Sequence, residues 1–303
     1  MTNAAPRIAG IELGGTKGIA LIAEGNRILD RRTYPTRDPE TTLKALTSAL
    51  LEWHAERPVN AVGIASFGPV NLDPGSSHFG HILTTPKPGW SGADILGSVQ
   101  GVLTCPVAID TDVNGAALAE YRWGVGQDCD SLCYLTIGTG IGGGLVINGA
   151  PVHGLLHPEI GHVRVRRAPG DNFPGICSFH GDCVEGLTSG PALMARFGTA
   201  ANKVAPNDPR WLPVAKELAE LTAMLLLTVS PRRILIGGGV GMGQSHLFPM
   251  IRAHCAELLA GYLPDLNASA LEDIIKQPSL GTDAGPMGAV ALGLLANATP
   301  LGR

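Results

Sequence analysis

Hydrophobic and polar positions along the chain form two kinds of segment, which together predict an α/β protein. Short apolar runs that end at glycine or polar turns predict strands, and longer runs with apolar residues every three or four positions predict helices. Strands are expected at 8–13, 17–23, 28–34, 61–66, 107–110, within 132–152, and at 234–236. Helices are expected from 39 onward, through 116–121, and near 191–197, 214–228, 245–259 and 286–295.

The first predicted helix has clear start signals and one apolar face. Asp38 precedes Pro39, an arrangement typical of an N-cap followed by the first helical position. Its apolar residues recur at helical spacing and should face a core; they are Leu43, Leu46, Leu50 and Trp53.

The same order of elements occurs twice, which predicts a duplicated α/β domain with a cleft between the copies. Each copy begins with two strands joined by a Gly/Thr turn, and the two turns begin at Gly14 and Gly138, 124 residues apart (138 − 14). Glycines in such a turn expose backbone N–H groups and let an anion approach closely. A third glycine run follows strand 234–236 and would let an adenosine lie against backbone. The predicted ATP contacts are Gly14, Gly15, Thr16, Lys17, Gly138, Thr139, Gly140, Gly237, Gly238 and Gly239.

A dinucleotide fold, a P-loop and plain hairpins each fit these glycines less well. Gly138-x-Gly140-x-x-Gly143 has the spacing of a dinucleotide fingerprint, but a strand rather than a helix is predicted after it. The sequence contains no G-x-x-x-x-G-K-[ST] motif, so a P-loop NTPase is excluded. Glycines that only shape a tight hairpin would explain a single turn of this kind, but the presence of two parallel copies favours nucleotide binding.

Composition and charge narrow the classes of function. The 303 residues suffice for two modest domains, and 45% of them are hydrophobic. The net charge is −4, from 22 basic and 26 acidic residues without a basic block, which argues against nucleic acid as a partner. No signal region or stretch of roughly 20 apolar residues occurs, so a cytoplasmic protein without a membrane partner is expected. Six cysteines in that setting suggest thiols or metal ligands rather than disulfides.

The catalytic candidate lies in Asp110-Thr111-Asp112-Val113-Asn114, where a buried strand is followed by a helix. Strand ends of this kind are where α/β proteins place their chemistry. Asp112 is the candidate general base for an attacking hydroxyl group, since phosphoryl transfer otherwise needs mainly positioning and charge neutralisation by Mg²⁺ and backbone donors. The alternative is that Asp110 or Asp112 is only an N-cap.

Two cysteines and two histidines form a candidate metal site: His162, Cys177, His180 and Cys183. Such a set closes a tetrahedron around zinc and is typical of a structural site. Idle thiols are the alternative. Glu159 and Glu185 flank the cluster and could accept hydrogen bonds from the hydroxyls of a sugar, although each alone is more often a solvated surface residue.

Four segments in combination resemble the ROK family, whose name stands for repressor, open reading frame and kinase. They are Gly10-Ile11-Glu12-Leu13-Gly14-Gly15-Thr16-Lys17, Asp112-x-Asn114-x-Ala116-Ala117-x-x-Glu120, Gly138-Thr139-Gly140-Ile141-Gly142-Gly143-Gly144, and Glu159-x-Gly161-His162 with the Cys/His cluster. The resemblance runs from about Ile8 to the last helix. It implies a two-domain actin/hexokinase/Hsp70-like ATPase fold, which is ribonuclease H-like, with an interdomain cleft.

The resemblance also implies roles for individual residues. ATP would be bound by the glycine turns with Mg²⁺, Asp112 would be the base, and a structural Zn²⁺ would be bound by the four cluster residues. The sugar contacts would be Glu159, His162, Glu185, Thr111, Gly68 and Pro69. The expected lobes are 1–111 plus 286–303, and 112–285. A homodimer is the expectation for the family.

Three departures from the commonest family pattern favour one branch. Glu12 stands where Asp is usual, Thr111 where many sugar kinases have Asn, and the cluster reads Cys-x-x-His-x-x-Cys. With Thr84-Thr85-Pro86-Lys87-Pro88-Gly89-Trp90, these features resemble the fructokinase branch, which would convert fructose to fructose 6-phosphate. Kinases for glucose, mannose or an N-acetylhexosamine remain alternatives. A sugar-responsive repressor is disfavoured, because the first strand at Ile8 leaves no room for a preceding helix-turn-helix.

Overall fold

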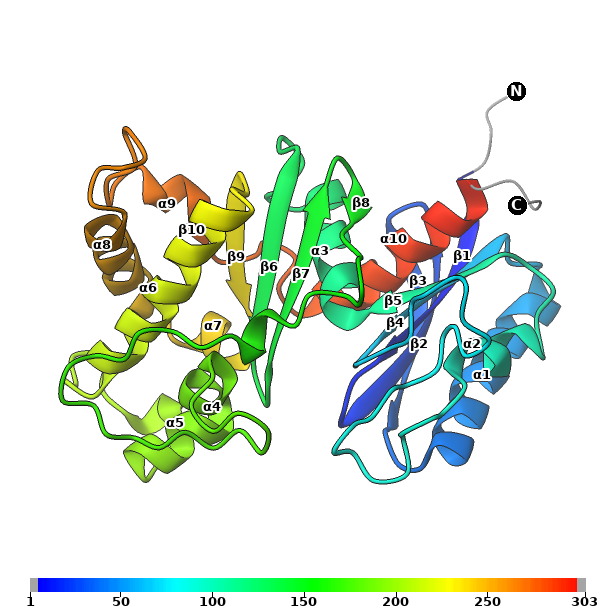
Figure 1. The fold of residues 1–303 in the computed structure, drawn as a ribbon. Helices are drawn as coiled ribbons and strands as arrows, with labels where there is room; N and C mark the ends of the chain where they lie inside the picture. Colours follow the sequence, from blue (N-terminus) through cyan, green and yellow to red (C-terminus); the bar gives the residue numbers. More distant parts are fainter. Residues whose placement is uncertain (1–4, 299–303) are drawn as a thin grey trace. The chain divides into compact units, whose positions relative to one another are not determined.

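The computed structural model describes residues 5–298, which divide into two compact units (Figure 1). The first unit contains the chain up to residue 127, residues 149–157, and the chain from 282; the second contains 128–148 and 158–281. This division differs from the predicted lobes. The helix that begins at Asp112 and the segment 149–157 group with the first unit rather than the second, since this helix contacts strands of the first sheet and Ala150–Pro151 contacts this helix.

The first unit is built on a mixed sheet of strand order β3-β2-β1-β4-β5. Its strands are β1 (Arg7–Leu13), β2 (Lys17–Glu24), β3 (Arg27–Pro35), β4 (Ala61–Ser66) and β5 (Val107–Thr111). The first three form an antiparallel meander, whereas β4 runs parallel to β1 and β5 parallel to β4. The parallel strands β1, β4 and β5 therefore end at one edge of the sheet.

Helices cover both faces of this sheet. They are α1 (Pro39–Glu56), α2 (Ile95–Gln100), α3 (Asp112–Trp123) and α10 (Ala284–Ala298), and α3 also contacts the short strand β8 (Ala150–Pro151). The predicted apolar face of α1 is at most 5% exposed and packs with β4 residues Val62 and Ile64 in one core. Gly63 points to the opposite face, where a Cβ would lie 1.9 Å from the carbonyl oxygen of Ala289 in α10. Glycine at this position lets α10 lie directly on the strand.

The second unit is built on a second sheet. Its strands β6 (Ser131–Ile137) and β7 (Ile141–Ile147) are antiparallel, β9 (Arg233–Gly237) is parallel to β6, and β10 (Ile275–Lys276) pairs with β9. Its helices are α4 (Val184–Thr188), α5 (Gly190–Phe197), α6 (Trp211–Thr228), α7 (Gly238–Gly243), α8 (Leu247–Leu259) and α9 (Leu271–Ile274). Helix α6 packs against α8 and α4. Short 3₁₀ helices occur at Ile160–His162, Ala201–Lys203 and Gly281–Asp283.

Most of the predicted elements are present with small shifts of their ends. Asp38 caps α1 as expected, because its Oδ1 accepts a hydrogen bond from the Thr41 amide at 2.8 Å. Pattern analysis missed α2, α4, α7 and α9. These helices have four to six residues, so apolar positions cannot recur often enough in them to show a helical pattern. Helix α7 was also hidden by the glycines with which it begins, since glycine disfavours helices.

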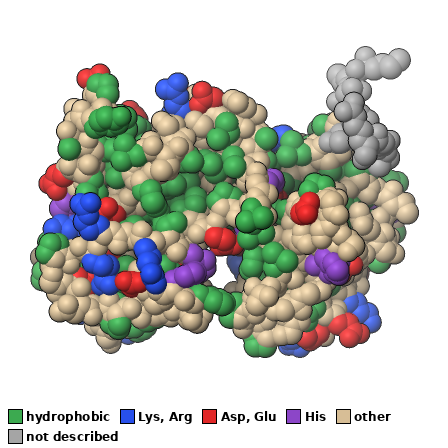
Figure 2. All heavy atoms as spheres, viewed as in Figure 1, with side chains coloured by type: hydrophobic (Ala, Val, Ile, Leu, Met, Phe, Trp, Pro, Cys, Tyr) green, Lys and Arg blue, Asp and Glu red, His purple; other side chains and the backbone are tan. Residues whose placement is uncertain are grey.

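Two surface properties bear on the predicted class of protein. Among residues 5–298, no helix combines the length and hydrophobicity that crossing a membrane requires. On the face drawn in Figure 2, basic side chains lie in small groups, several of them beside acidic ones. Several of the arginines form ion pairs with carboxylates, among them Arg31 with Asp283 and Arg210 with Asp208.

Candidate active site

Three predicted site segments leave the first sheet side by side. In the strand register, Leu13 is paired with Ser66, and Ser66 with Thr111. The chain continues from these three positions into the glycine turn, the Phe67–Pro69 loop and the first residue of α3, Asp112. Since neighbouring strands lie about 4.8 Å apart, the first and last of these exits are about 10 Å apart. The predicted phosphate turn, a loop and a carboxylate are thus brought to one edge by the sheet.

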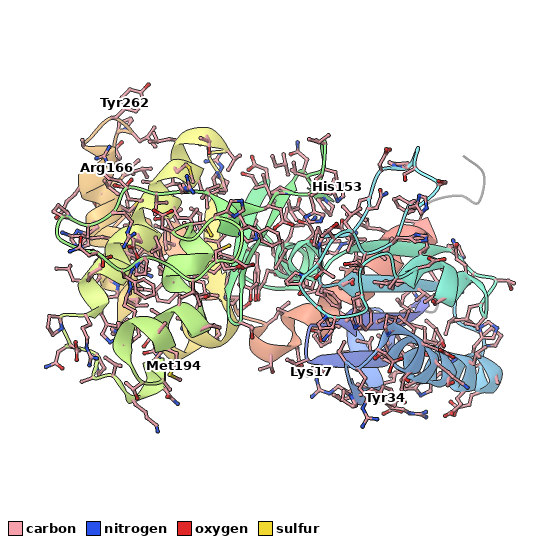
Figure 3. All side chains as sticks on the ribbon, turned by 60° about the horizontal axis from the view of Figure 1, so that its bottom comes forward. Lys17, Tyr34, His153, Arg166, Met194 and Tyr262 are labelled. Atoms are coloured by element: carbon pink, nitrogen blue, oxygen red, sulfur yellow. The ribbon has the colours of Figure 1, made fainter. Side chains whose placement is uncertain are left out.

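The turn Gly14–Lys17 is closed by a hydrogen bond of 2.9 Å from the amide of Gly14 to the carbonyl of Lys17. It is joined to the end of β3 through Thr36, whose hydroxyl donates to the Gly14 carbonyl at 2.8 Å. Figure 3 labels Lys17 and Tyr34 at this edge of the sheet, in agreement with the pairing of β2 and β3. The turn is therefore fixed from two strands and keeps an open face, because a Cβ on Gly15 would meet no atom within 4 Å.

The three side chains of Asp110-Thr111-Asp112 make different hydrogen bonds. Asp110 is buried, and its Oδ1 accepts hydrogen bonds of 2.7 Å from the Thr111 amide and from Asn114 Nδ2. Thr111 is the N-cap of α3, since its hydroxyl accepts from the Asn114 amide at 3.1 Å. The alternative that an aspartate is only the cap therefore does not apply. Asp112 is the first helical residue, and its Oδ1 accepts from the Val113 amide at 2.9 Å.

Two histidines that sequence analysis missed lie against this edge. His153 Nε2 is 2.9 Å from Oδ2 of Asp110, and this hydrogen bond raises the pKa of His153 above its usual range. His157 is buried, and its Nε2 accepts a hydrogen bond of 3.1 Å from the Val70 amide, beside the cis Gly68–Pro69 peptide. Neither histidine belongs to a spacing motif, so only the fold links them to the site.

The second unit brings two of the predicted glycine groups together. The turn Gly138–Gly140 is closed by a 2.9 Å bond between its ends, and the amide of Gly190, at the start of α5, donates to the Gly138 carbonyl at 2.7 Å. Gly238 has a φ of +76°, and a Cβ there would lie 2.5 Å from the carbonyl oxygen of Ile137. The run at 237–239 thus lies directly against the end of β6, where the other turn begins.

The two predicted sugar-binding glutamates lie close to this second turn. Glu185 Oε2 accepts a hydrogen bond of 2.9 Å from the Ile141 amide. The pKa of Glu159 is raised by burial and, to a smaller extent, by the charge of Glu185. Two neighbouring carboxylates can accept several hydroxyl hydrogen bonds, and one of them is already oriented by the backbone of the glycine turn.

The four predicted metal ligands converge in the second unit. Their ligand atoms all lie within 4.8 Å of one another, and both sulfurs approach Nδ1 of His162, at 3.8 Å from Cys177 and 3.7 Å from Cys183. Tetrahedral zinc–sulfur and zinc–nitrogen bonds would place such atoms about 3.6 Å apart. Burial raises the pKa of Cys183 to about 11, so a cation is needed to hold this thiol as a thiolate at neutral pH. The donor set therefore fits zinc.

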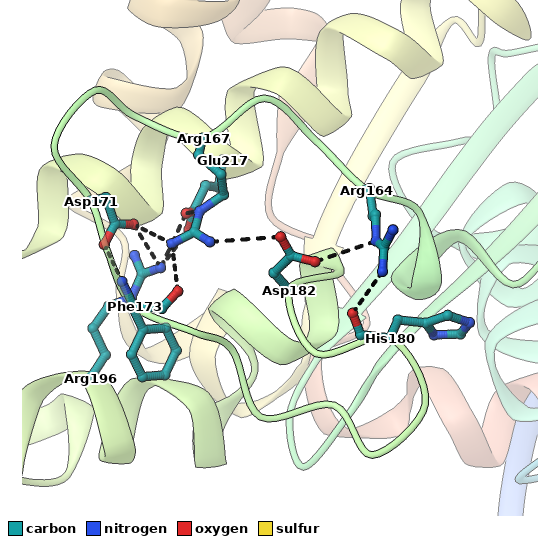
Figure 4. Close-up of polar contacts among 8 residues, drawn as sticks. All are labelled: Arg164, Arg167, Asp171, Phe173, His180, Asp182, Arg196 and Glu217. Atoms are coloured by element: carbon teal, nitrogen blue, oxygen red, sulfur yellow. Dashed lines mark hydrogen bonds and ion pairs between the residues drawn. The ribbon is translucent and has the colours of Figure 1, made fainter.

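A charged network holds the segments on both sides of this cluster (Figure 4). Arg164 donates to the His180 carbonyl at 3.2 Å and pairs with Asp182, and Asp182 also lies 3.9 Å from Arg167. Arg167 continues the network to buried Glu217 on α6 at 3.1 Å. Sequence analysis did not identify this network, whose members are far apart in the chain.

One further carboxylate at the first sheet has an unused oxygen. Glu12, near the end of β1, has a buried Oε2 with no hydrogen-bond partner among the described residues. Burial raises the pKa of Glu12, and the charge of Lys17 opposes that shift. A buried carboxylate oxygen without a hydrogen-bond partner, beside the predicted phosphate turn, is a suitable ligand for a divalent cation.

Comparison with known proteins gives concordant matches over nearly the whole chain. The model of the ROK family matches residues 8–295. A fructokinase of Zymomonas mobilis is 42% identical, over 94% of this chain and 96% of its own. A putative fructokinase of Bacillus subtilis is 39% identical, over 94% of both chains. The crystal structure of a ROK family glucokinase from Streptomyces griseus, in complex with glucose and AMPPNP, superposes with a TM-score of 0.74 at 26% identity, covering 95% of this chain and 99% of its own.

Proposed function

This chain belongs to the ROK family, and we propose that it transfers the γ-phosphoryl group of ATP to the 6-hydroxyl of D-fructose, with Asp112 as the general base. The relatives at 37–42% identity that carry the name fructokinase support this choice of hexose. They agree with the motif Thr84–Trp90 and with the departures from the commonest family pattern at Glu12, Thr111 and the Cys/His cluster.

One observation carries the proposal: the phosphate turn, the Phe67–Pro69 loop and Asp112 follow paired positions of three adjacent parallel strands. The register of a sheet sets such positions far more rigidly than loops do. The turn and Asp112 would then hold a nucleotide phosphate and a sugar hydroxyl from opposite sides of a space of about 10 Å, in which the reacting groups of the two substrates can meet. This arrangement suits direct transfer from one substrate to the other, for which positioning is the main requirement.

In the proposed reaction, the carboxylate of Asp112 accepts the proton of the 6-hydroxyl of the sugar. The oxygen of this hydroxyl attacks the γ-phosphorus, and the bond between the γ-phosphorus and the oxygen that leaves with ADP breaks. Asp110 holds the first turn of α3 through Thr111 and Asn114, so that Asp112 keeps its orientation. We assign the remaining hydroxyls of the sugar to Glu159 and Glu185, with His162, Thr111, Gly68 and Pro69 as further contacts.

The nucleotide contacts are proposed at both glycine turns, Gly14–Lys17 and Gly138–Gly140, with the adenosine against Gly237–Gly239. Mg²⁺ bound with ATP would neutralise phosphate charge, and Glu12 is the residue we propose to hold it. The four Cys/His residues would hold a structural Zn²⁺, which orders the loop before α4 and hence Glu185. We further propose that the protein forms a homodimer and acts in the cytoplasm. Light scattering of the purified protein would measure the oligomeric state.

The test is ADP release from MgATP with fructose, glucose, mannose and N-acetylmannosamine, followed by NMR identification of the phosphorylated carbon. We expect the highest kcat/KM with fructose and phosphate on carbon 6. A higher kcat/KM with another hexose would replace fructose as the substrate and leave the kinase assignment intact. ADP release with none of the sugars would contradict the proposal itself.

A further inference from the structure

We propose that Lys87 is a positioning residue of the first phosphate turn, which turns the peptide between Gly15 and Thr16 so that its N–H faces the bound phosphates. The Nζ of Lys87 donates a hydrogen bond of 2.6 Å to the carbonyl oxygen of Gly15. The two residues are 72 positions apart in the chain, and both belong to the first unit. The inference rests on the proposed function only in taking Gly14–Lys17 as a phosphate turn.

All four carbonyl groups of this turn accept hydrogen bonds from protein donors. The Gly14 carbonyl accepts from the Thr36 hydroxyl, the Gly15 carbonyl from Lys87, and the Thr16 carbonyl from the Thr36 amide at 2.9 Å. The Lys17 carbonyl accepts from the amide of Gly14. Each carbonyl of the turn is thereby held toward the protein.

The direction of the carbonyls sets the direction of the amides. In a planar trans peptide the N–H of one residue points opposite to the C=O of the residue before it. The bonds at Gly14, Gly15 and Thr16 therefore turn the amides of Gly15, Thr16 and Lys17 away from those donors. Backbone amides that are turned away from protein acceptors in this way can donate to a bound anion. Of the donors that hold these carbonyls, Lys87 is the one that carries a charge.

The segment around Lys87 is anchored well enough to serve this purpose. Trp90 is fully buried, and its indole N–H donates to the Arg37 carbonyl at 2.7 Å. The Trp90 ring makes an edge contact with Phe67, with centroids 5.1 Å apart, and the amide of Leu83 donates to the Pro69 carbonyl at 2.8 Å. The segment that carries Lys87 is therefore anchored on both sides of it, at Leu83 and at Trp90, beside the predicted sugar-binding loop Phe67–Pro69. This gives a physical role to the motif Thr84–Trp90.

A charged donor does more here than a neutral one. An ammonium–carbonyl hydrogen bond polarises the peptide, so the Thr16 N–H becomes a stronger donor for the phosphate. The positive charge also offsets part of the negative charge of the nucleotide through the same peptide. Lys87 should therefore affect the binding of phosphates and leave the binding of the adenosine moiety unchanged.

The experiment compares MgATP and adenosine on the full-length protein and on Lys87→Met, by calorimetry and NMR titration respectively. We expect MgATP to bind about tenfold more weakly to the variant, as loss of a charged hydrogen bond predicts, with adenosine affinity unchanged. Lys87→Arg should restore most of the affinity for MgATP. The matched control is Lys44→Met, which removes the same charge from an exposed position on α1.

Three results would overturn the inference. Equal weakening of MgATP and adenosine, with a lower melting temperature, would mean that Lys87 only supports the fold. Unchanged MgATP affinity, or an equal loss in Lys44→Met, would mean that the hydrogen bond to Gly15 has no part in phosphate binding. Failure of the proposed function is seen separately, as absence of hexose-dependent ADP release by the unmodified protein.

Discussion

Replacement of Asp112 by Asn separates the chemical step from folding, because the structure allows both effects to be estimated. The amide of Asn keeps an oxygen that can accept the Val113 hydrogen bond of 2.9 Å and removes only the charge and the proton-accepting carboxylate. A negative charge in the first turn of a helix contributes about 0.3–1 kcal/mol through the helix dipole. The melting temperature should therefore fall by roughly 1–4 °C.

The catalytic effect should be much larger than this. A positioned general base contributes about 10²–10⁴-fold to the rate, which is about 2.7–5.5 kcal/mol in the activation free energy. We expect kcat to fall by that factor, while the Kd for MgATP changes by less than about threefold. The assay is steady-state ADP release with fructose, together with calorimetric binding of MgATP and a thermal melt.

The matched control is Asp38→Asn, which removes the same charge at the N-terminus of α1 in the same unit. Asn is as good an N-cap as Asp, so this variant should keep its activity and lose little stability. A kcat for Asp112→Asn within tenfold of the unmodified protein would refute Asp112 as the base. A comparable loss of kcat in Asp38→Asn would refute the inference that the effect is local.

Three further predictions concern the metal cluster, the pair His153–Asp110 and the glycine run 237–239. Cys183→Ser should reduce bound zinc from about one ion per chain to near zero and lower the melting temperature, as measured by elemental analysis and a thermal melt; an unchanged zinc content would exclude Cys183 as a ligand. Because the pKa of His153 is raised by Asp110, the pair stabilises the fold fully below the unfolded pKa of about 6.5 and less as the pH rises through the folded pKa. Denaturant unfolding across this pH range should show that loss in the unmodified protein and not in His153→Asn, and parallel profiles would contradict it. Gly238→Ala should cost about 1–3 kcal/mol in the free energy of unfolding, whereas Gly239→Ala, with no atom near the added Cβ, should leave this free energy unchanged; equal losses of stability at both positions would count against the backbone contact as the cause.

Sequence alone determined the family, the fold and the hexose kinase activity of this protein, and the comparisons confirm these predictions. It did so because the information is local. A strand of period two, a capped helix such as the one that begins at Pro39, and a glycine turn are each written in neighbouring residues. The convergence of the four Cys/His residues was also predictable, since three of them lie within seven positions.

Tertiary structure alone decided how these local pieces meet. Strand register placed Leu13, Ser66 and Thr111 in one row, and no local pattern specifies pairing between strands so far apart in the chain. The contacts of His153 with Asp110 and of Lys87 with Gly15 likewise span 43 and 72 positions. A polar side chain acquires such a partner only when packing of the sheet and helices brings the two together. The two units were divided differently from the prediction for the same reason, because membership of a unit depends on contacts and not on order in the chain.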